Sequence, residues 1–470
     1  MRRVLIILAV GVLALLPDVP ASATAWGPLA PPNPFLGPAG TATMHGDAGS
    51  SDATPLAGPG PRATILGVYS LGSACPTILE GSDNLVVALC TAIVGRIPTV
   101  YLLDPAAPGP LPTPLAVLPL VKGSLLGGVY AYLDADDRLV VVDGENHMLR
   151  VRHERDSAGH WRLISEEFAD LGAVIPIGDN VTGLVPDWSG NIWFATGRGT
   201  VGFVAPTRRI TAVTLPAGEQ VANSISAAAS GRIAVATTHA LYELRAGASG
   251  TPEILWRAAY DRGSARKPGQ LSWGTGSTPT YFGPETGADY VVIVDNADER
   301  VQVLVFHSGT GRLVCAVPVL TAGGRGSENS PIAIGRSVFV ASTYGYPYPA
   351  LPDGSGPAVP SSAPFTGGMT RIDVVDAVCR PVWQNTVRSA AVPRLSIADG
   401  ALYTVTRVGL DRTTLFDGHA FTVLDPDTGA VTASVPLPGT IVHDPLQTVP
   451  LITRSGRILQ GTVTGILRVG

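Results

Sequence analysis

Charge is scarce in this 470-residue sequence, and lysine is almost missing. Charged residues make up 15% of the chain, the formal net charge is −5, and only Lys122 and Lys267 are lysines. No basic cluster occurs along the chain. Because proteins that bind nucleic acids neutralise phosphates with clustered Lys and Arg, we do not expect this chain to bind nucleic acid.

Several catalytic and membrane signatures are also missing. Beyond residues 4–16, no apolar run approaches the ~20 residues that span a bilayer, so we expect no membrane span. The histidines form no H-E-x-x-H motif, the cysteines form no C-x-x-C motif, and no G-x-S-x-G elbow is present. These absences disfavour a zinc protease, a redox-active thiol pair and an α/β-hydrolase.

The first 25 residues have the pattern of a secretory signal. Arg2 and Arg3 precede an apolar stretch of 13 residues, Val4–Leu16, and small residues follow up to Ala25. We therefore expect residues 1–25 to be a Sec-type signal peptide and the mature protein to be extracytoplasmic, an uncleaved anchor being the alternative.

The four cysteines fit an exported protein, in which they are expected to form two disulfides. Three connectivities are possible, and we favour Cys75–Cys90 together with Cys315–Cys379.

Two further regions follow the signal. Residues 26–62 are dominated by Pro, Gly, Ala and small polar residues, which predicts a flexible, disordered linker. Residues 63–470 carry period-2 and short apolar runs, and no window keeps a 3.6-residue period. Together with 55 glycines and 41 prolines in a chain that is 45% hydrophobic, this pattern predicts one all-β domain with many turns.

A repeated phrase indicates which all-β architecture to expect. An apolar run, a tight turn, a second apolar run and a small-residue stop recur in four clear copies, at 181–196, 224–237, 330–342 and 395–406. Repeats of this length are typical of β-propeller blades. With looser copies, the first strands of seven units are expected near residues 126, 181, 224, 277, 330, 395 and 447.

An earlier unit lies within 85–120, so we count eight blades, with seven as the alternative. The last unit has three strands, and residues 63–69 are expected to supply its fourth and close the ring.

The outer strands carry a further pattern. Thr-Gly turns occur at Thr310-Gly311 and Thr428-Gly429, and Trp161, Trp256 and Trp383 fall on expected outermost strands. In these features the chain resembles the quinoprotein-like (PQQ-binding-like) propellers, whose blades carry a Thr-Gly turn and a tryptophan that docks on the next blade. The resemblance implies the propeller fold. It also implies PQQ and Ca²⁺ as cofactors.

The family's dehydrogenases have an adjacent cysteine pair that this chain lacks, so the resemblance implies the fold more directly than the cofactor. The turn Asp187–Trp193 is also similar to that of lactonase-type and streptogramin-lyase-type propellers.

Loop lengths predict which face is functional. The hairpin loops between first and second strands are short, whereas residues 262–276, 344–368 and 407–418 form long insertions. The insertions enter first strands or join second to third strands, so they share one face, which we expect to hold the site.

Residues just before the first strands are expected to ring the channel mouth on that face. They are mainly amides, namely Asn180, Asn223, Ser277, Asn329 and Arg394. Such a ring suits an anionic or carbonyl ligand, or a hard cation held by oxygen, and Glu328 with Asn329 are the predicted Ca²⁺ ligands. The alternative is that these asparagines cap the strand starts.

Further candidates lie on the same face. Asp295, Asp298 and Arg300 occupy one second-to-third-strand connection, and Arg388 with Arg394 would suit a carboxylate or phosphate. The longest loop carries three alternating tyrosines, Tyr344, Tyr346 and Tyr348, and rigid aromatics presented in this way suit a sugar or another flat ligand. The alternatives are a plain turn, solvated arginines and a loop packed on itself.

The leading hypothesis is a secreted, monomeric propeller that binds a small molecule, a glycan or a protein on this face. The alternative is a cation-dependent hydrolase, lactonase or lyase with His147 or His239 as general base. A PQQ-dependent oxidoreductase, with Asp295 or Glu328 as base, is the third hypothesis.

Overall fold

The computed structural model describes residues 26–123 and 130–470. The predicted signal peptide, 1–25, lies outside the described residues, as does the predicted strand start at 126. Among the described residues, no helix has the length and apolar character that crossing a bilayer requires.

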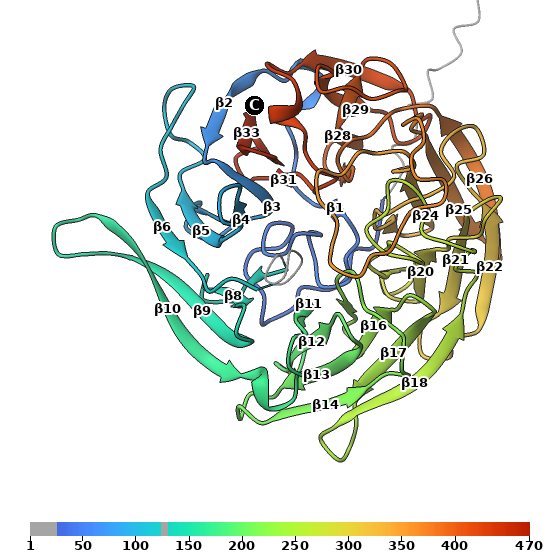
Figure 1. The fold of residues 1–470 in the computed structure, drawn as a ribbon, viewed down its shortest axis with the longest axis horizontal. Coiled ribbons are helices and arrows are strands. Elements are labelled where there is room, and N and C mark those ends of the chain that lie inside the picture. The colour runs from blue at the N-terminus through green and yellow to red at the C-terminus, as the bar shows by residue number, and fades with distance from the viewer. Residues whose placement is uncertain (1–25, 124–129) are drawn as a thin grey trace, which may run out of the picture.

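Within the described chain, the strands form eight sheets arranged around a central axis, which confirms the eight-bladed propeller (Figure 1). The first four blades, each given from its innermost strand outward, are β3 (Ser73–Glu80), β4 (Val86–Ala92), β5 (Pro98–Leu103) and β6 (Ala116–Pro119); β7 (Tyr132–Leu133), β8 (Leu139–Val142), β9 (His147–Arg155) and β10 (Trp161–Asp170); β11 (Val181–Pro186), β12 (Ile192–Thr196), β13 (Thr200–Val204) and β14 (Ile210–Thr214); and β15 (Ser226–Ala227), β16 (Arg232–Ala236), β17 (Ala240–Ala246) and β18 (Pro252–Ala259).

The other four blades follow the same order. They are β19 (Thr280–Phe282), β20 (Tyr290–Val294), β21 (Gln302–His307) and β22 (Leu313–Pro318); β23 (Ile332–Ile334), β24 (Ser337–Ala341), β25 (Met369–Val375) and β26 (Val378–Asn385); β27 (Arg394–Ser396), β28 (Ala401–Val408), β29 (Gly418–Leu424) and β30 (Val431–Pro436); and β31 (Leu451–Ile452), β32 (Ile458–Thr462), β33 (Gly465–Val469) and β2 (Ile65–Ser70).

The ring closes through the chain's own N-terminal part, as the sequence predicted. Strand β2 pairs antiparallel with β33, from Ile65 opposite Val469 to Ser70 opposite Gly465. The last blade therefore takes three strands from the C-terminus and its outermost strand from residues 65–70.

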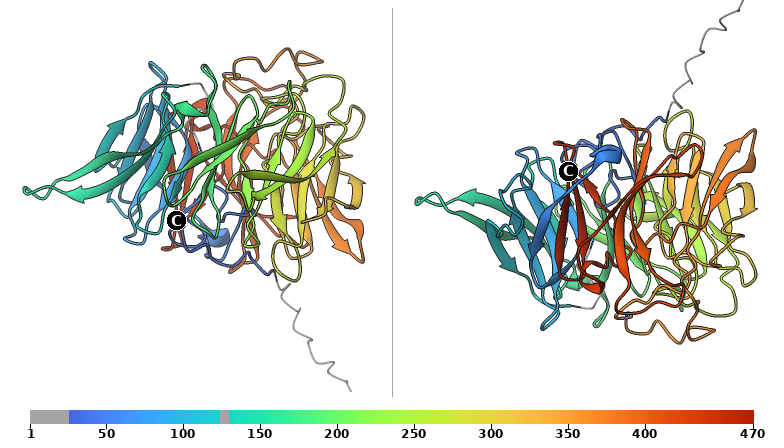
Figure 2. Two further views of the ribbon diagram at one scale, coloured as in Figure 1. Left: turned by 90° about the horizontal axis from the view of Figure 1, so that it is seen from below. Right: turned by 90° about the horizontal axis from the view of Figure 1, so that it is seen from above.

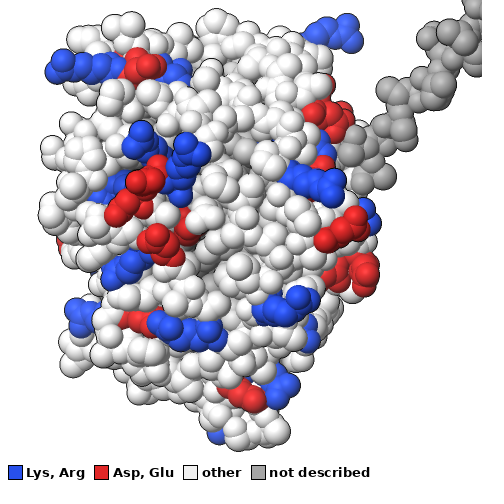
Figure 3. Space-filling view, turned by 90° about the vertical axis from the view of Figure 1, so that its right-hand side faces the viewer, with Lys and Arg blue, Asp and Glu red and all other residues white. Residues whose placement is uncertain are grey.

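Blades are held together by apolar side chains between neighbouring sheets. Middle strands such as β12 and β20 are covered on both faces, which is why they are near-continuous apolar runs. One cluster joins Trp193 of the third blade to Ile225 and Val235 of the fourth. Outermost strands are exposed on one side, and basic and acidic side chains are interspersed on the flank that Figure 3 shows.

Two tryptophans dock on the turn of the following blade. Gly311 lies against the Trp256 ring, and Gly429 lies against the Trp383 ring; a Cβ at either glycine would come within 2.5 Å of the ring. Trp161, Trp256 and Trp383 all lie on fourth strands, as predicted. This interlocking is a feature of the propeller architecture.

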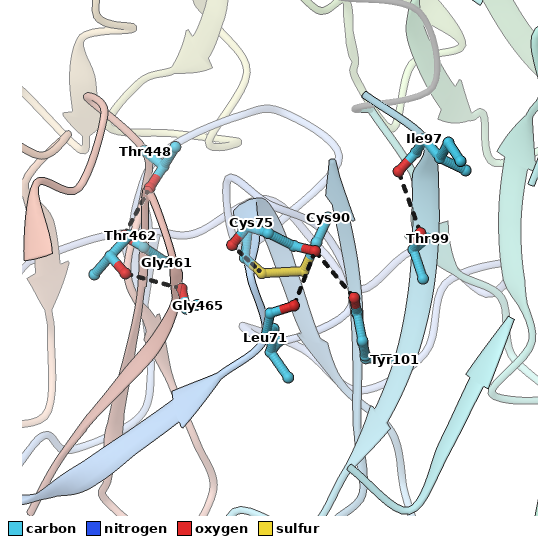
Figure 4. Close-up of a disulfide and its surroundings, with 11 residues drawn as sticks. Leu71, Cys75, Cys90, Ile97, Thr99, Tyr101, Thr448, Gly461, Thr462 and Gly465 are labelled. Atoms are coloured by element: carbon cyan, nitrogen blue, oxygen red, sulfur yellow. Dashed lines mark hydrogen bonds between the residues drawn. A yellow bond between two sulfur atoms is a disulfide. The ribbon is translucent and has the colours of Figure 1, made fainter. Parts of the chain in front are cut away.

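Both predicted disulfides are present. Cys75–Cys90 joins β3 to β4 within the first blade (Figure 4). Cys315–Cys379 links the outermost strands of the fifth and sixth blades. The first lies beside the channel and the second fastens two blades at the rim.

The prediction of a flexible linker over residues 26–62 is wrong. This segment runs across the face of the short hairpins and then enters the channel, so that the blue chain occupies the centre of the ring in Figure 1. On the hairpin face, the Asn33 side chain donates to the Pro186 carbonyl at 2.8 Å, and the Trp188 indole donates to Pro32 at 3.1 Å.

Residues 41–54, which we call the plug, bind the channel wall through their backbone. Their carbonyl oxygens accept hydrogen bonds from the innermost strands of six blades, at Glu80, Leu133, Ala227, Tyr281, Ala333 and Leu395. The plug ends in β1 (Ala53–Thr54), which pairs parallel with β27. Small residues serve this purpose because the chain must approach many strands closely, and that composition is also typical of a linker.

A buried charge fixes the plug in place. Asp52 is fully buried, accepts a hydrogen bond from the Ser330 hydroxyl at 2.6 Å, and lies 3.0 Å from His45 and 3.9 Å from Arg394. Short 3-10 turns complete the described structure at η1 (Gly60–Arg62), η2 (Leu171–Ala173) and η3 (Ile441–His443).

Candidate functional site

The three long insertions gather on the face opposite the N-terminal segment, as predicted (Figure 2). They hold one another by backbone hydrogen bonds: Val359 donates to Arg266 at 2.9 Å, Gly345 to Pro268 at 2.9 Å and Phe365 to Asp411 at 2.8 Å. The insertions, which come from blades four to seven, thus form one connected layer, and we call this side of the ring the loop face.

Among the described residues, the plug closes the channel from the hairpin side and leaves a cavity of about 390 Å³ on the loop side. Its floor includes Met44 and His45 of the plug, and its wall includes the Cys75 end of β3 and Gly461 and Thr462 of β32 (Figure 4). Most of the remaining lining is apolar or small, including Pro76, Ala92, Ile93, Leu271, Pro349, Ala350, Val392, Leu446, Val449 and Val463.

Glu328 brings a carboxyl group to this apolar cavity. The residue precedes β23 and is 7% exposed. Its Oε1 lies 3.4 Å from the Asn223 side-chain amide, and its Oε2 has no hydrogen-bond partner among the described residues. Burial raises the pKa of Glu328 to about 8, and the Leu271 backbone amide and the Asn223 side chain offset this only partly.

A glycine makes room for this carboxyl group. A Cβ on Gly276 would lie 2.5 Å from Glu328 Oε2, so any larger residue would displace the side chain. The Gly276 carbonyl accepts a hydrogen bond from Asn223 Nδ2 at 2.6 Å, which also fixes the orientation of that amide.

Two tyrosines line the same cavity as the carboxyl group. The Tyr130 hydroxyl donates to Asn223 Oδ1 at 3.2 Å, and Tyr348 enters the lining from the longest insertion. Burial, and then the nearby charge of Glu328, raise the pKa of both phenols, so both remain protonated hydroxyls. Both aromatic rings therefore lie in the cavity wall within the electrostatic reach of one carboxyl group.

The predicted amide ring is only partly assembled. Asn223 and Asn329 line the cavity with Glu328, and Asn329 Nδ2 donates to Gln447 Oε1 at 3.0 Å. Asn180 instead lines a neighbouring cavity of about 280 Å³, and the Ser277 hydroxyl accepts from the Val294 backbone at 3.1 Å inside the wall.

Arg394 does not lie at the mouth of the channel. It is buried deeper, against the plug, where its Nε donates to the Pro450 carbonyl at 3.2 Å. The guanidinium of Arg394 faces Asp52 of the plug and so helps to hold the plug in place. The predicted position of Arg394 at the channel mouth is therefore wrong.

The other candidates on the loop face make local contacts. Asp295 accepts from the Gln302 backbone at 2.7 Å, and burial raises its pKa to about 6. Asp298 accepts from the Ser264 backbone at 2.9 Å, and Arg300 is exposed. These three residues shape a turn and do not line the channel cavity.

Arg388 and Tyr346 hold the insertions together. The Arg388 guanidinium donates to the carbonyl oxygens of Phe365, Gly409 and Leu410 at 2.7–2.8 Å. Tyr346 is buried, packs edge-to-face on Phe365 and donates its hydroxyl to Asp444. Both residues therefore stabilise the insertions and do not line the channel cavity.

The two candidate bases lie outside the channel cavity. His147 stands 3.6 Å from Asp143 at the start of β9. His239 contacts the Arg262 guanidinium at 2.6 Å, and burial together with that cation lowers its pKa. Neither imidazole contributes to the lining that contains Glu328.

Several cavity residues are not among those that the sequence predicted. Met44 and His45 belong to a segment with the composition of a linker, and Tyr130 lies just beyond the strand start expected near 126. Tyr348, in contrast, is one of the three alternating tyrosines that the sequence singled out, and it is the one of the three that lines the cavity.

The predicted cofactors have no further support from the geometry. In the described part of the chain, no three His, Cys, Asp or Glu side chains gather closely enough to hold a metal ion. The Ca²⁺ site at Glu328 and Asn329 stays a prediction, and so does PQQ.

The sequence matches no protein-family model. An uncharacterized protein of Archaeoglobus fulgidus is 31% identical over 134 residues, which are 27% of this chain and 26% of that protein. The chain thus spans about a quarter of the length of that relative.

Solved structures of similar shape are β-propellers of different kinds. Sqt1 of Chaetomium thermophilum has a TM-score of 0.51 at 10% identity, over 86% of this chain and 97% of that chain. A streptogramin B lyase has a TM-score of 0.44 at 9% identity, over 87% and 97%. At such identities these likenesses show the fold alone, and function has to be argued from the site.

Proposed function

We propose that this protein is an extracytoplasmic binding protein that takes a small, largely apolar molecule into the channel cavity at its loop face. The observation that carries the proposal is the shape of the channel. Among the described residues, the plug closes it from the hairpin side, and a cavity of about 390 Å³ remains on the loop side. Small-molecule sites commonly have volumes of about 300–1,000 Å³ and combine apolar walls with a few polar groups.

The plug supports this proposal because it creates a floor. Six blades donate backbone hydrogen bonds to it, and the buried Asp52 anchors it. A floor fixed in this way makes the cavity a preformed pocket, so little ordering is needed when a ligand enters.

Binding fits the lining better than hydrolysis does. The polar groups at the cavity include one carboxyl, several amides and hydroxyls, two phenols, the His45 imidazole and the Arg96 guanidinium, and such groups can orient a ligand. His147 and His239, which a hydrolase mechanism would use as bases, lie elsewhere. The two disulfides support the extracytoplasmic part of the proposal, because disulfides persist in oxidising compartments.

The test is binding of the neutral dye N-phenyl-1-naphthylamine, whose fluorescence increases in apolar surroundings. Ala350 lines the cavity, so Ala350→Trp fills part of it, whereas Ala158→Trp changes an exposed turn between β9 and β10. We expect the wild type and Ala158→Trp to bind the dye equally and Ala350→Trp to bind it at least tenfold more weakly. Failure of the wild type to bind the dye, or equal binding by all three proteins, would contradict the proposal.

A further inference from the structure

The channel cavity holds a buried carboxyl group with one oxygen atom that has no hydrogen-bond partner among the described residues. Among the described residues, Glu328 forms no salt bridge, and its Oε2 accepts no hydrogen bond although the side chain is more than nine-tenths buried. The cation whose field reaches it is Arg266, and the guanidinium of Arg266 already donates to the carbonyl oxygens of Gly356 at 3.0 Å and Gln270 at 2.7 Å. A buried carboxylate is normally paired, so this one calls for an explanation.

We propose that the ligand is a small organic cation, an apolar molecule that carries an ammonium group and places it beside Glu328 and the rings of Tyr130 and Tyr348. This inference rests on the proposed function of the same cavity. A carboxylate supplies the counter-charge, and tyrosine rings attract ammonium ions through their negative faces. The apolar remainder of the cavity would enclose the hydrocarbon part of the ligand.

The surroundings of Glu328 favour an organic cation over a metal ion. Ca²⁺ takes six to eight oxygen ligands and is normally held by several carboxylates, whereas Glu328 is the one acidic side chain among the described residues of the lining, and no three His, Cys, Asp or Glu side chains gather there. An ammonium group with alkyl substituents needs one counter-charge and apolar contacts, and this wall offers both.

Other titratable groups at the cavity are engaged or lie at its rim. The His45 imidazole of the floor contacts Asp52 through Nδ1 at 3.0 Å, its Nε2 has no hydrogen-bond partner among the described residues, and an imidazole supplies no negative charge. Arg96 is exposed at the rim, and the phenols of Tyr130 and Tyr348 stay protonated. Among the described residues of the lining, Glu328 is therefore the group that can supply the negative counter-charge to a cation in the cavity.

The test compares two probes of the same shape that differ by one positive charge, phenyltrimethylammonium and tert-butylbenzene. Each is used to displace N-phenyl-1-naphthylamine at pH 8.5, where most of the Glu328 side chains are ionised. We expect the cation to displace the dye at a concentration at least tenfold lower than the neutral probe. In Glu328→Gln the dye and tert-butylbenzene should bind as before, and the preference for the cation should disappear.

A second pair of variants tests the aromatic contribution. Tyr348→Phe should keep the preference for the cation, because the ring remains, and Tyr348→Leu should reduce it about threefold to tenfold. Dye binding serves as the folding control for every variant.

The outcomes separate the two proposals. If the dye binds but the cation is no better than the neutral probe, or Glu328→Gln keeps the preference, the inference about charge is overturned and the proposed function stands. If the wild type binds no dye, the proposed function itself fails.

Discussion

Replacing Glu328 with Gln should change how the stability of the protein depends on pH. The carboxyl group has a pKa of about 8 in the folded protein, against an ordinary value of 4.5. Below pH 4.5 the carboxyl is protonated in both states and contributes no pH dependence. Between pH 4.5 and 8 the unfolded chain releases a proton that the folded chain keeps, so stability falls as the pH rises.

The size of this effect follows from the shift. Each pKa unit corresponds to about 1.4 kcal/mol, so the wild type should lose about 3 kcal/mol from this group between pH 5.5 and pH 8. The amide of the Glu328→Gln variant cannot ionise, so this loss should be absent there. Below pH 4.5 the two proteins should be similar, because a protonated carboxyl and an amide have nearly the same shape and both are neutral. At pH 5.5 the unfolded carboxyl is already ionised, so the wild type should be less stable than the variant by about 1.4 kcal/mol.

The assay is equilibrium unfolding in urea, followed by tryptophan fluorescence, at pH 5.5 and pH 8.5 for both proteins. All other titrating groups contribute equally to the two, so the difference between the two pH dependences isolates Glu328. We expect a double difference of about 3 kcal/mol, with the variant the more stable protein at pH 8.5. If the stabilities of the wild type and the variant change equally between the two pH values, so that the double difference is below about 1 kcal/mol, this carboxyl is solvated or paired. That result would refute the reasoning.

Three further predictions concern binding, the plug and the rim. Phenyltrimethylammonium does not titrate, so its affinity should rise about tenfold per unit from pH 6 to pH 8 as Glu328 ionises and then level off; a flat profile would contradict the role of the carboxylate. Arg394→Met leaves Asp52 without its nearby cation, and we expect a loss of about 3–5 kcal/mol in urea unfolding and faster proteolysis within residues 41–54; an unchanged digestion pattern would argue against the anchor. Replacing Cys315 and Cys379 together with Ser opens a link across 64 residues and should cost about 2–4 kcal/mol of stability while dye binding stays unchanged, since the bond lies at the rim; loss of dye binding would contradict that separation.

The blades could be predicted from the sequence because each repeats one local pattern. Apolar runs around short turns define the inner hairpins, and a three-stranded last unit requires a strand from elsewhere, which residues 65–70 supply. The disulfide pairing was one of three that four cysteines allow, and the structure confirms it, with Cys315 and Cys379 on the outermost strands of adjacent blades.

The plug could not be predicted, because its binding energy is carried by the backbone. Residues such as Ala48, Gly49 and Ser51 reach the innermost strands through carbonyl oxygens, and such contacts leave no apolar period in the sequence. Small residues serve a close approach as well as a flexible linker, so composition alone does not distinguish the two.

The site was only partly predictable for a related reason. Alignment identifies which residues precede the first strands, but the loops and the plug decide which of them reach the cavity. Asn223, Glu328 and Asn329 do, whereas Ser277 lies inside the wall and Arg394 lies against the plug.

The central claim is that the plug turns the channel into a pocket and that Glu328 receives the charge of its ligand. A crystal structure of the protein grown with phenyltrimethylammonium at pH 8.5 tests both parts at once. We predict that residues 41–54 fill the hairpin side of the channel and that the ammonium group lies beside Glu328, between Tyr130 and Tyr348. A channel open at both ends, or a cation bound only on the outer surface, would contradict the account.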